Sequence, residues 1–361
     1  MKRIQQARKQ FFPQGIDGLL VASMANIRYL SGFASEERNV ALLLLTQDKQ
    51  YLITDYRFGE QAEEQCHSTT TDVVVRDRAR ESLGQLINRI ASNENLKRLG
   101  FEQHHFMHGQ WLALEQELTM ETKPVADVIE RLRRIKDSAE QNDIREAARI
   151  GDQALELLLP KLRPGVTERE AALMLESSLM QLGSEGLAFP TIFASGPRSA
   201  RPHGMPSKRI LQSGDLLTID FGAVVNGYRS DMTRSFVIGR ASAQQREVYA
   251  LVQEAQQLGL DAVISGTTCS EPADIVSRFL CDSPYGRFAG DGLGHALGLE
   301  THEKPYFAAG DDTVLEPGFV MTVEPGIYIP GWGGVRIEDD VLVTASGIEV
   351  LNSFPKELIE L

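Results

Sequence analysis

The sequence has few cysteines, no long apolar run and no excess of positive charge, and each lack excludes a class of protein. The three thiols, Cys66, Cys269 and Cys281, form no Cys-x-x-Cys pair, and an odd number suits a reducing compartment better than a disulfide framework. No apolar segment approaches the roughly 18 residues of a membrane span, and residues 1–15 carry scattered charges where a signal peptide has an apolar core. We therefore expect a cytoplasmic protein.

Acidic residues outnumber basic ones, which restricts the choice of partner. Fifty Asp and Glu against 37 Lys and Arg give a formal charge of −13, a field that repels phosphate backbones and anionic membrane surfaces. Phosphate-binding glycine loops and Ser or Cys nucleophile motifs are also missing from the sequence. We expect neither nucleic acid nor a membrane as a partner, and no acyl-enzyme chemistry.

The pattern of the 361 residues changes near residue 130, which suggests two domains. Before that point, short β-rich runs such as 41–45 alternate with helical patterns, which is typical of α/β structure. After it, Ser138 and Gln141 form a capping-box pattern at the start of a helix rich in Ala, Ile and Leu. We predict a smaller N-terminal α/β domain over residues 1–130 and a second domain over residues 131–361.

The second domain contains an internal repeat. Residues 214–222 (GDLLTIDFG) align with 318–326 (GFVMTVEPG) at an offset of 104, which places Asp220 opposite Glu324. Further on, YRSD aligns with VRIE at an offset of 107, which adds Asp231 and Glu338. Shared glycines, threonines and acids indicate a duplication whose halves pack about a pseudo-twofold axis. Each half then contributes two carboxylates from a pair of strands.

The first pair of acids is expected to share one face of a hairpin. If Asn226 and Gly227 form a two-residue turn, Asp220 pairs with Thr233 and Asp231 lies diagonally, roughly 7 to 8 Å away. Exposed acids on a solvated face are the alternative, but the neighbouring apolar runs favour burial. Buried carboxylates repel one another unless cations compensate them. We predict two divalent ions, with Mn²⁺ favoured and Co, Zn or Fe as alternatives.

Histidines accompany these acids. His295 and His302 lie in a glycine-rich segment directly before the second acidic pair, and His203 precedes the first. A lone histidine is more often structural, but four nearby acids favour His295 as a fifth ligand. His203 is a candidate for proton or oxyanion chemistry. The triplet of His104, His105 and His108 lacks acidic or cysteine partners at ligand spacing and is better explained as solvated, while Trp332 fits either a pocket wall or a packed loop.

From about residue 132 to 351 the chain resembles the pita-bread metallopeptidases, the family of methionine aminopeptidase, aminopeptidase P and prolidase. The resemblance is closest to the Xaa-Pro peptidase branch, and the smaller domain resembles the one that precedes it there. The motifs that carry it are FPTIFASG (189–196), PHG (202–204), IDFG (219–222), SDMTR (230–234), TVEPG (322–326) and VRIED (335–339).

The resemblance implies a set of roles for these residues. The implied metal ligands are Asp220, Asp231, His295, Glu324 and Glu338. Asp231 and Glu338 would bridge the ions, and Arg336 would lie beside Glu338 or contact substrate. His203 and His302 would line the substrate site. From the chemistry of a two-metal site we further expect His203 or His302 to stabilise the developing oxyanion and Glu324 to relay a proton to the leaving nitrogen. A homodimer is implied as well.

The implied reaction is hydrolysis of the peptide bond before proline in short peptides, with a hydroxide that bridges two metal ions as the nucleophile. The enzyme would be either an Xaa-Pro dipeptidase or an Xaa-Pro aminopeptidase. Two other readings are a creatinase-like hydrolase of another small C–N bond and a non-catalytic module of the same fold. The intact five-ligand set disfavours both.

Two residues depart from the branch. Asp291 stands where a histidine is common, which changes the charge near the expected leaving-group side, and Thr301 replaces an aliphatic residue.

Overall fold

The computed structural model describes residues 2–361, and the chain divides into two compact units, Met1–Arg133 and Arg134–Leu361. Helix α6 (Glu130–Arg133) falls in the first unit because its side chains bond there: Arg133 Nη1 donates to Asn26 Oδ1 at 2.7 Å, and Asn26 Nδ2 donates to Glu130 Oε1 at 2.6 Å. Among the described residues, no helix is long and apolar enough to cross a membrane.

The first unit is built on a six-stranded sheet in the order β4-β3-β2-β1-β5-β6. Its strands are β1 (Gly18–Val21), β2 (Leu42–Leu45), β3 (Gln50–Asp55), β4 (Thr71–Arg76), β5 (Arg98–Glu102) and β6 (Glu121–Val125). Its other helices are α1 (Lys2–Phe11), α2 (Met24–Ser31), α3 (Gly59–Cys66), α4 (Leu83–Asn93) and α5 (His108–Glu115). Apolar residues of α4 and α5 pack on central strands of the sheet, as the alternating sequence pattern predicts.

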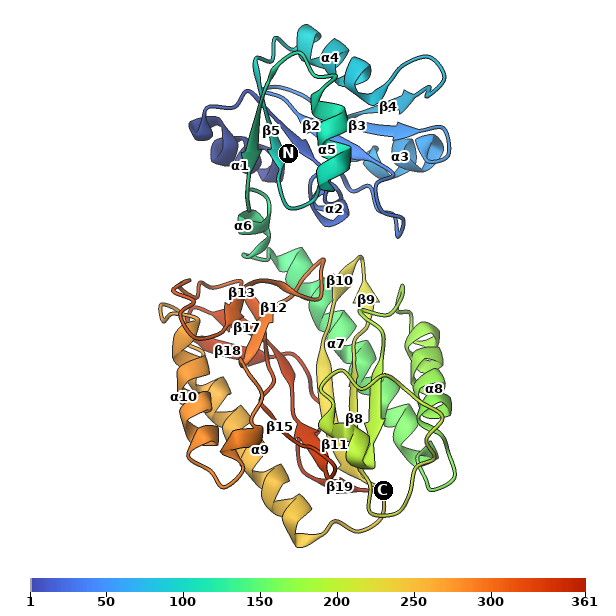
Figure 1. Ribbon diagram of the computed structural model, residues 1–361, viewed down its shortest axis with the longest axis vertical. Helices are drawn as coiled ribbons and strands as arrows, with labels where there is room; N and C mark the ends of the chain where they lie inside the picture. The colour runs from blue at the N-terminus through green and yellow to red at the C-terminus, as the bar shows by residue number, and fades with distance from the viewer. Residues whose placement is uncertain (1) are drawn as a thin grey trace. The chain divides into compact units, whose positions relative to one another are not determined.

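The second unit places its strands between two pairs of long helices (Figure 1). The helices are α7 (Ser138–Leu158), α8 (Glu168–Gln181), α9 (Ala243–Ala262) and α10 (Ser270–Cys281). The first-half strands are β7 (Ile192–Ser195), β8 (Leu216–Phe221), β9 (Val224–Val225), β10 (Tyr228–Arg229) and β11 (Met232–Val237). The second-half strands are β12 (Gly294–Ala296), β13 (Glu303–Phe307), β14 (Val320–Val323), β15 (Gly326–Ile329), β16 (Gly333–Arg336), β17 (Asp339–Thr344) and β18 (Gly347–Val350), and β19 (Ile359–Glu360) pairs with β11.

The two halves of this unit repeat the same packing. Helices α7 and α8 share one apolar core with β8 and β11, and α9 and α10 share the other with β14 and β17. In each half the two strands pair antiparallel and flank the segments that carry the acids. The internal duplication that we read from the sequence therefore exists as two helix pairs, each covering its own strand pair.

The first hairpin has the predicted register. Asp220 pairs with Thr233, and the turn places Asn226 at φ 47° and Gly227 at φ 77°, as a two-residue turn of this type requires. Close approach of the strands makes glycine necessary at position 222, where a Cβ atom would meet the Ser230 carbonyl oxygen at 1.7 Å. The hairpin prediction is confirmed.

The predicted cap of α7 is wrong by one residue. The side chain of Asp137, not of Ser138, accepts hydrogen bonds from the first turn, and Glu140 completes the capping box. Gln141 instead donates to the Lys136 carbonyl oxygen at 2.8 Å. Aspartate and serine are about equally good N-caps, and Asp137 takes the role because the backbone is already helical at Ser138.

Candidate metal centre

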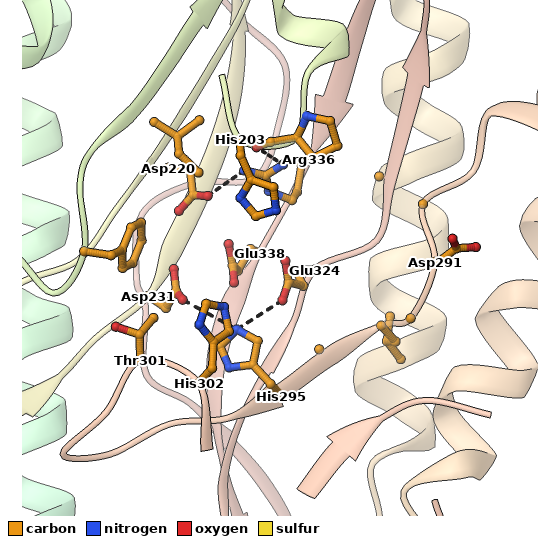
Figure 2. A pocket seen from close by; sticks show the side chains of 18 of the residues that line it. His203, Asp220, Asp231, Asp291, His295, Thr301, His302, Glu324, Arg336 and Glu338 are labelled. Carbon is orange, nitrogen blue, oxygen red and sulfur yellow. Dashed lines mark hydrogen bonds and ion pairs between the residues drawn. The ribbon is translucent and has the colours of Figure 1, made fainter. Parts of the chain in front are cut away.

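Four buried or half-buried carboxylates converge on one cavity of the second unit (Figure 2). Asp220 lies near the end of β8 and Asp231 directly before β11, while Glu324 follows β14 and Glu338 lies between β16 and β17. The cavity has a volume of about 800 Å³. Each half of the duplication thus delivers two acids from its strand ends, which is the convergence that the aligned motifs predict.

Asp220 is held from one side only. Its Oδ2 atom accepts a hydrogen bond from Arg336 Nη2 at 2.6 Å, and its Oδ1 atom is buried without a hydrogen-bond partner among residues 2–361. A buried carboxylate oxygen left without a donor is costly unless a cation or water binds it. This oxygen is therefore an open ligand position.

The neighbouring acids perturb one another strongly. Burial and then the charge of Glu338 raise the pKa of Asp231 well above its usual value, and burial and then Glu324 do the same for Glu338. Burial raises the pKa of Glu324 to about 7. Shifts in this direction mean that the protein alone disfavours the charged form of these acids. A bound cation would favour the charged form, so the shifts are those expected of a cation-binding site without its ion.

Two threonine hydroxyls hold the glutamates. Thr233 Oγ1 donates to Glu338 Oε2 at 2.6 Å and accepts from Arg336 Nε at 2.9 Å. Thr322 Oγ1 donates to Glu324 Oε1 at 3.1 Å and accepts from the backbone N–H of His295 at 3.1 Å. Both carboxylates are therefore oriented before any ligand binds.

His295 presents a free nitrogen to the acids. Its Nδ1 atom lies 3.1 Å from the Ala296 carbonyl oxygen, and because that oxygen can only accept, Nδ1 carries the proton. Nε2 then has a lone pair, 3.4 Å from Glu324 Oε1 and 3.7 Å from Asp231 Oδ2. Burial lowers the pKa of this imidazole, which favours the neutral form that binds metals.

The donor set fits divalent cations. Ligand atoms of Asp231, His295 and Glu338 all lie within 4.8 Å of one another. Asp220 and Glu324 line the same cavity, which brings the set to four carboxylates and one neutral imidazole. Arg336 is the one arginine among the lining residues. Oxygen ligands with a single imidazole suit first-row divalent ions, and no thiolate is among the residues that line the cavity.

The other predicted site residues lie around the cavity mouth. His203 and His302 are exposed and line the cavity, and the His302 ring centroid is 4.3 Å from that of His295. Asp291 also lines it, but its carboxylate points away from the four acids (Figure 2). Thr301 donates its hydroxyl to the Ala188 carbonyl oxygen at 2.9 Å, a bond that an aliphatic residue could not make.

Sequence reasoning missed several residues of the site. Tyr328 accepts from Arg336 Nη1 at 2.8 Å, and the carboxylate of Asp340 accepts the backbone N–H of Asp231 at 2.9 Å. The threonines were missed too, although the hairpin register already places Thr233 opposite Asp220. Tyr328 reaches the site through the hairpin of β15 with β16, which also carries Arg336.

The weaker candidates lie elsewhere. His105 Nε2 lies 3.2 Å from Glu130 Oε1 in the first unit, and His104 contacts the neighbouring Gln103. Among the described residues, no group that could hold a metal includes these histidines or His108. Trp332 packs against the apolar core of the second half and is not among the residues that line the cavity.

Comparison with known proteins agrees with this geometry. Residues 142–345 match metallopeptidase family M24, and residues 3–135 match the creatinase/prolidase N-terminal domain. The uncharacterized peptidase YqhT of Bacillus subtilis is 39% identical over 99% of both chains. A solved structure of an Xaa-Pro dipeptidase from Bacillus anthracis superposes with a TM-score of 0.94 at 38% identity, covering 100% of this chain and 99% of that one.

An X-Pro aminopeptidase structure from Thermotoga maritima gives a TM-score of 0.91 at 31% identity over 99% of both chains. These superpositions confirm the predicted fold class, a mixed α/β chain with a smaller N-terminal domain and a duplicated C-terminal pita-bread domain. Since the family match spans more than half of the residues and the relatives align along nearly the whole length, the chain belongs to metallopeptidase family M24.

Proposed function

We propose that this protein is a dinuclear-metal exopeptidase that hydrolyses the peptide bond before proline in short peptides. The observation that carries the proposal is the convergence of four carboxylates and a neutral imidazole on one cavity. The similarity to proteins described as an Xaa-Pro dipeptidase and an X-Pro aminopeptidase supports the substrate class.

The proposed ligands of the two divalent ions are Asp220, Asp231, His295, Glu324 and Glu338. Asp231 and Glu338 would be shared between the ions, as the family resemblance implies, and burial, together with the charges of acids from both halves, raises the pKa of each. Bound ions would supply an acidified water and a Lewis acid for the peptide carbonyl. Mn²⁺ is the proposed metal, on the ground that oxygen donors predominate in this set.

The remaining side chains would orient the substrate and move protons. His203 and His302 lie at the mouth of the cavity, where an imidazole N–H could stabilise charge on the carbonyl oxygen during attack. Glu324 is held through one oxygen by Thr322, and its carboxylate could carry a proton to the departing nitrogen. An amide nitrogen of proline has no N–H, so its recognition has to come from shape. Phe189, Pro190 and Ile192 give the cavity an apolar wall for this purpose.

A metal-reconstituted assay tests the proposal. Protein loaded with Mn²⁺ is offered Xaa-Pro dipeptides, Xaa-Pro tripeptides and matched Xaa-Ala peptides, and release of the first amino acid is measured. We expect release from proline substrates and little from the alanine controls. Preference within the proline set separates dipeptidase from aminopeptidase. Turnover of no proline substrate would contradict the proposal.

We further propose a cytoplasmic homodimer. All three cysteines are unpaired, and two of them, Cys66 and Cys269, are buried, which suits a reducing compartment. The dimer rests on the family resemblance. Light scattering should give a mass of about twice the 40.0 kDa of the chain, and a mass equal to one chain would contradict the dimer.

A further inference from the structure

The two threonine hydroxyls that contact the glutamates have a fixed hydrogen-bond polarity. A hydroxyl has one proton to donate, whereas the Arg336 Nε–H and the His295 backbone N–H can only donate. Thr233 Oγ1 must therefore accept from Arg336, and Thr322 Oγ1 must accept from His295. The single proton of each hydroxyl is left for its glutamate.

This polarity determines what each glutamate oxygen can do. Glu338 Oε2 receives the Thr233 proton at 2.6 Å, and Glu324 Oε1 receives the Thr322 proton at 3.1 Å. Each bond ties one carboxylate oxygen to a buried hydroxyl, which restricts rotation of the carboxylate and leaves its other oxygen directed elsewhere. Both threonines are fully buried, so water cannot readily replace the hydroxyls.

Each half of the second unit supplies one such threonine, but the two threonines differ in where their glutamate lies in the sequence. Thr233 lies in β11 of the first half and holds the glutamate of the second half, which joins the two hairpins at the cavity. Thr322 lies in β14 and holds the glutamate two residues further along its own chain segment. Each glutamate is thus oriented by one threonine whose proton has no other use.

We infer that Thr233 and Thr322 are positioning residues that orient the carboxylates of Glu338 and Glu324 for divalent cations. The inference rests on the metal site of the proposed function. Neither hydroxyl is expected to touch substrate, so the effect acts through the glutamates. Partners of metal ligands of this kind typically change metal affinity about 10- to 100-fold when removed.

The sequence repeat supplies a matched control. Thr218 lies in β8 at the position that aligns with Thr322, and it is equally buried. Its hydroxyl lies 3.4 Å from Ser235 Oγ and 3.3 Å from the Gly334 carbonyl oxygen, and neither partner is an acid. Thr218→Val therefore makes the same isosteric change in an equivalent strand.

The test is Mn²⁺ titration by calorimetry on the full chain. Thr233→Val and Thr322→Val should each weaken Mn²⁺ binding about 10- to 100-fold, Thr→Ser at the same positions should restore it, and Thr218→Val should bind as the unchanged protein does. Thermal melting identifies any variant that does not fold, and Thr→Ala then removes the same hydroxyl in its place.

Unchanged Mn²⁺ affinity in the hydroxyl-free variants would overturn the inference while leaving the proposed function standing. Equal weakening in Thr218→Val, or no restoration by serine, would also overturn it, since the effect would then come from packing. Absence of Mn²⁺ binding to the unchanged protein would overturn the metal site and this inference together.

Discussion

At the scale of single residues, the metal-free site is costly because several acids share one buried place. Burial raises the pKa of Glu324 to about 7, and burial followed by neighbouring charge raises the pKa of Asp231 and Glu338. Arg336 offsets part of this charge through its 2.6 Å bond to Asp220. The remaining charge is the reason we expect ligand binding and folding stability to be coupled.

The coupling has a predictable pH dependence. An acid with a raised pKa binds more protons in the folded than in the unfolded state between its unfolded value, about 4.3, and its folded value. In the metal-free protein, the contribution of these raised pKa values to folding stability is therefore largest below that window. It is lost as pH rises through the window, which extends to about 7 for Glu324. Bound cations displace these protons.

Melting temperatures with and without Mn²⁺ should show this effect. We expect the rise in Tm caused by saturating Mn²⁺ to be several degrees larger at pH 7.5 than at pH 5, because at pH 5 the cations have to displace bound protons. The size follows from the conversion of 1 kcal/mol into a Tm shift of roughly 2 to 4 °C for a domain of this size. Asp231→Asn, which lacks the central carboxylate, should show a smaller pH effect. An equal rise at both pH values would contradict the coupling.

At the scale of elements, the hairpins bring the acids together, and their register could be predicted from the sequence. The Asn226–Gly227 turn and period-two alternation were enough to place Asp220 opposite Thr233. The N-cap of α7 was misplaced by one residue, because Asp137 and Ser138 are both good caps and only the backbone decides between them. Contacts between hairpins, such as that of Thr233 with Glu338, depend on packing that no local pattern encodes.

Close contact between the first pair of strands gives a prediction at this scale. Gly222→Ala places a methyl group 1.7 Å from the Ser230 carbonyl oxygen, so the backbone next to Asp231 has to move. We expect a loss of about 3 kcal/mol in unfolding free energy, at the upper end of overpacking effects, together with weaker Mn²⁺ binding. Chemical denaturation and calorimetry measure the two effects.

Gly186→Ala is the matched control, since an added Cβ atom there meets nothing within 4 Å. It should leave both stability and Mn²⁺ binding close to those of the unchanged protein. If Gly222→Ala behaved like this control, the close approach of the strands would not be what fixes the distance between the two aspartates.

At the scale of the whole molecule, the internal duplication explains why the four acids of the site could be predicted from a single sequence. The repeated motifs GDLLTIDFG and GFVMTVEPG correspond to strands that end at the same cavity, and the two helix pairs cover them from outside. The sequence could identify the acids because each stands at the same place in its repeat. It could not identify Thr322 or Asp340, whose roles depend on where a neighbouring backbone N–H points.

The measurement that tests the central claim most directly is the stoichiometry of Mn²⁺ bound to the metal-stripped protein, with Asp231→Asn and Glu338→Gln beside it. Exposed Asp274 on α10 provides the control Asp274→Asn. We predict two ions per chain for the unchanged and control proteins, and loss of the pair in both cavity variants. Full occupancy in either cavity variant, or no bound Mn²⁺ in the unchanged protein, would contradict the account.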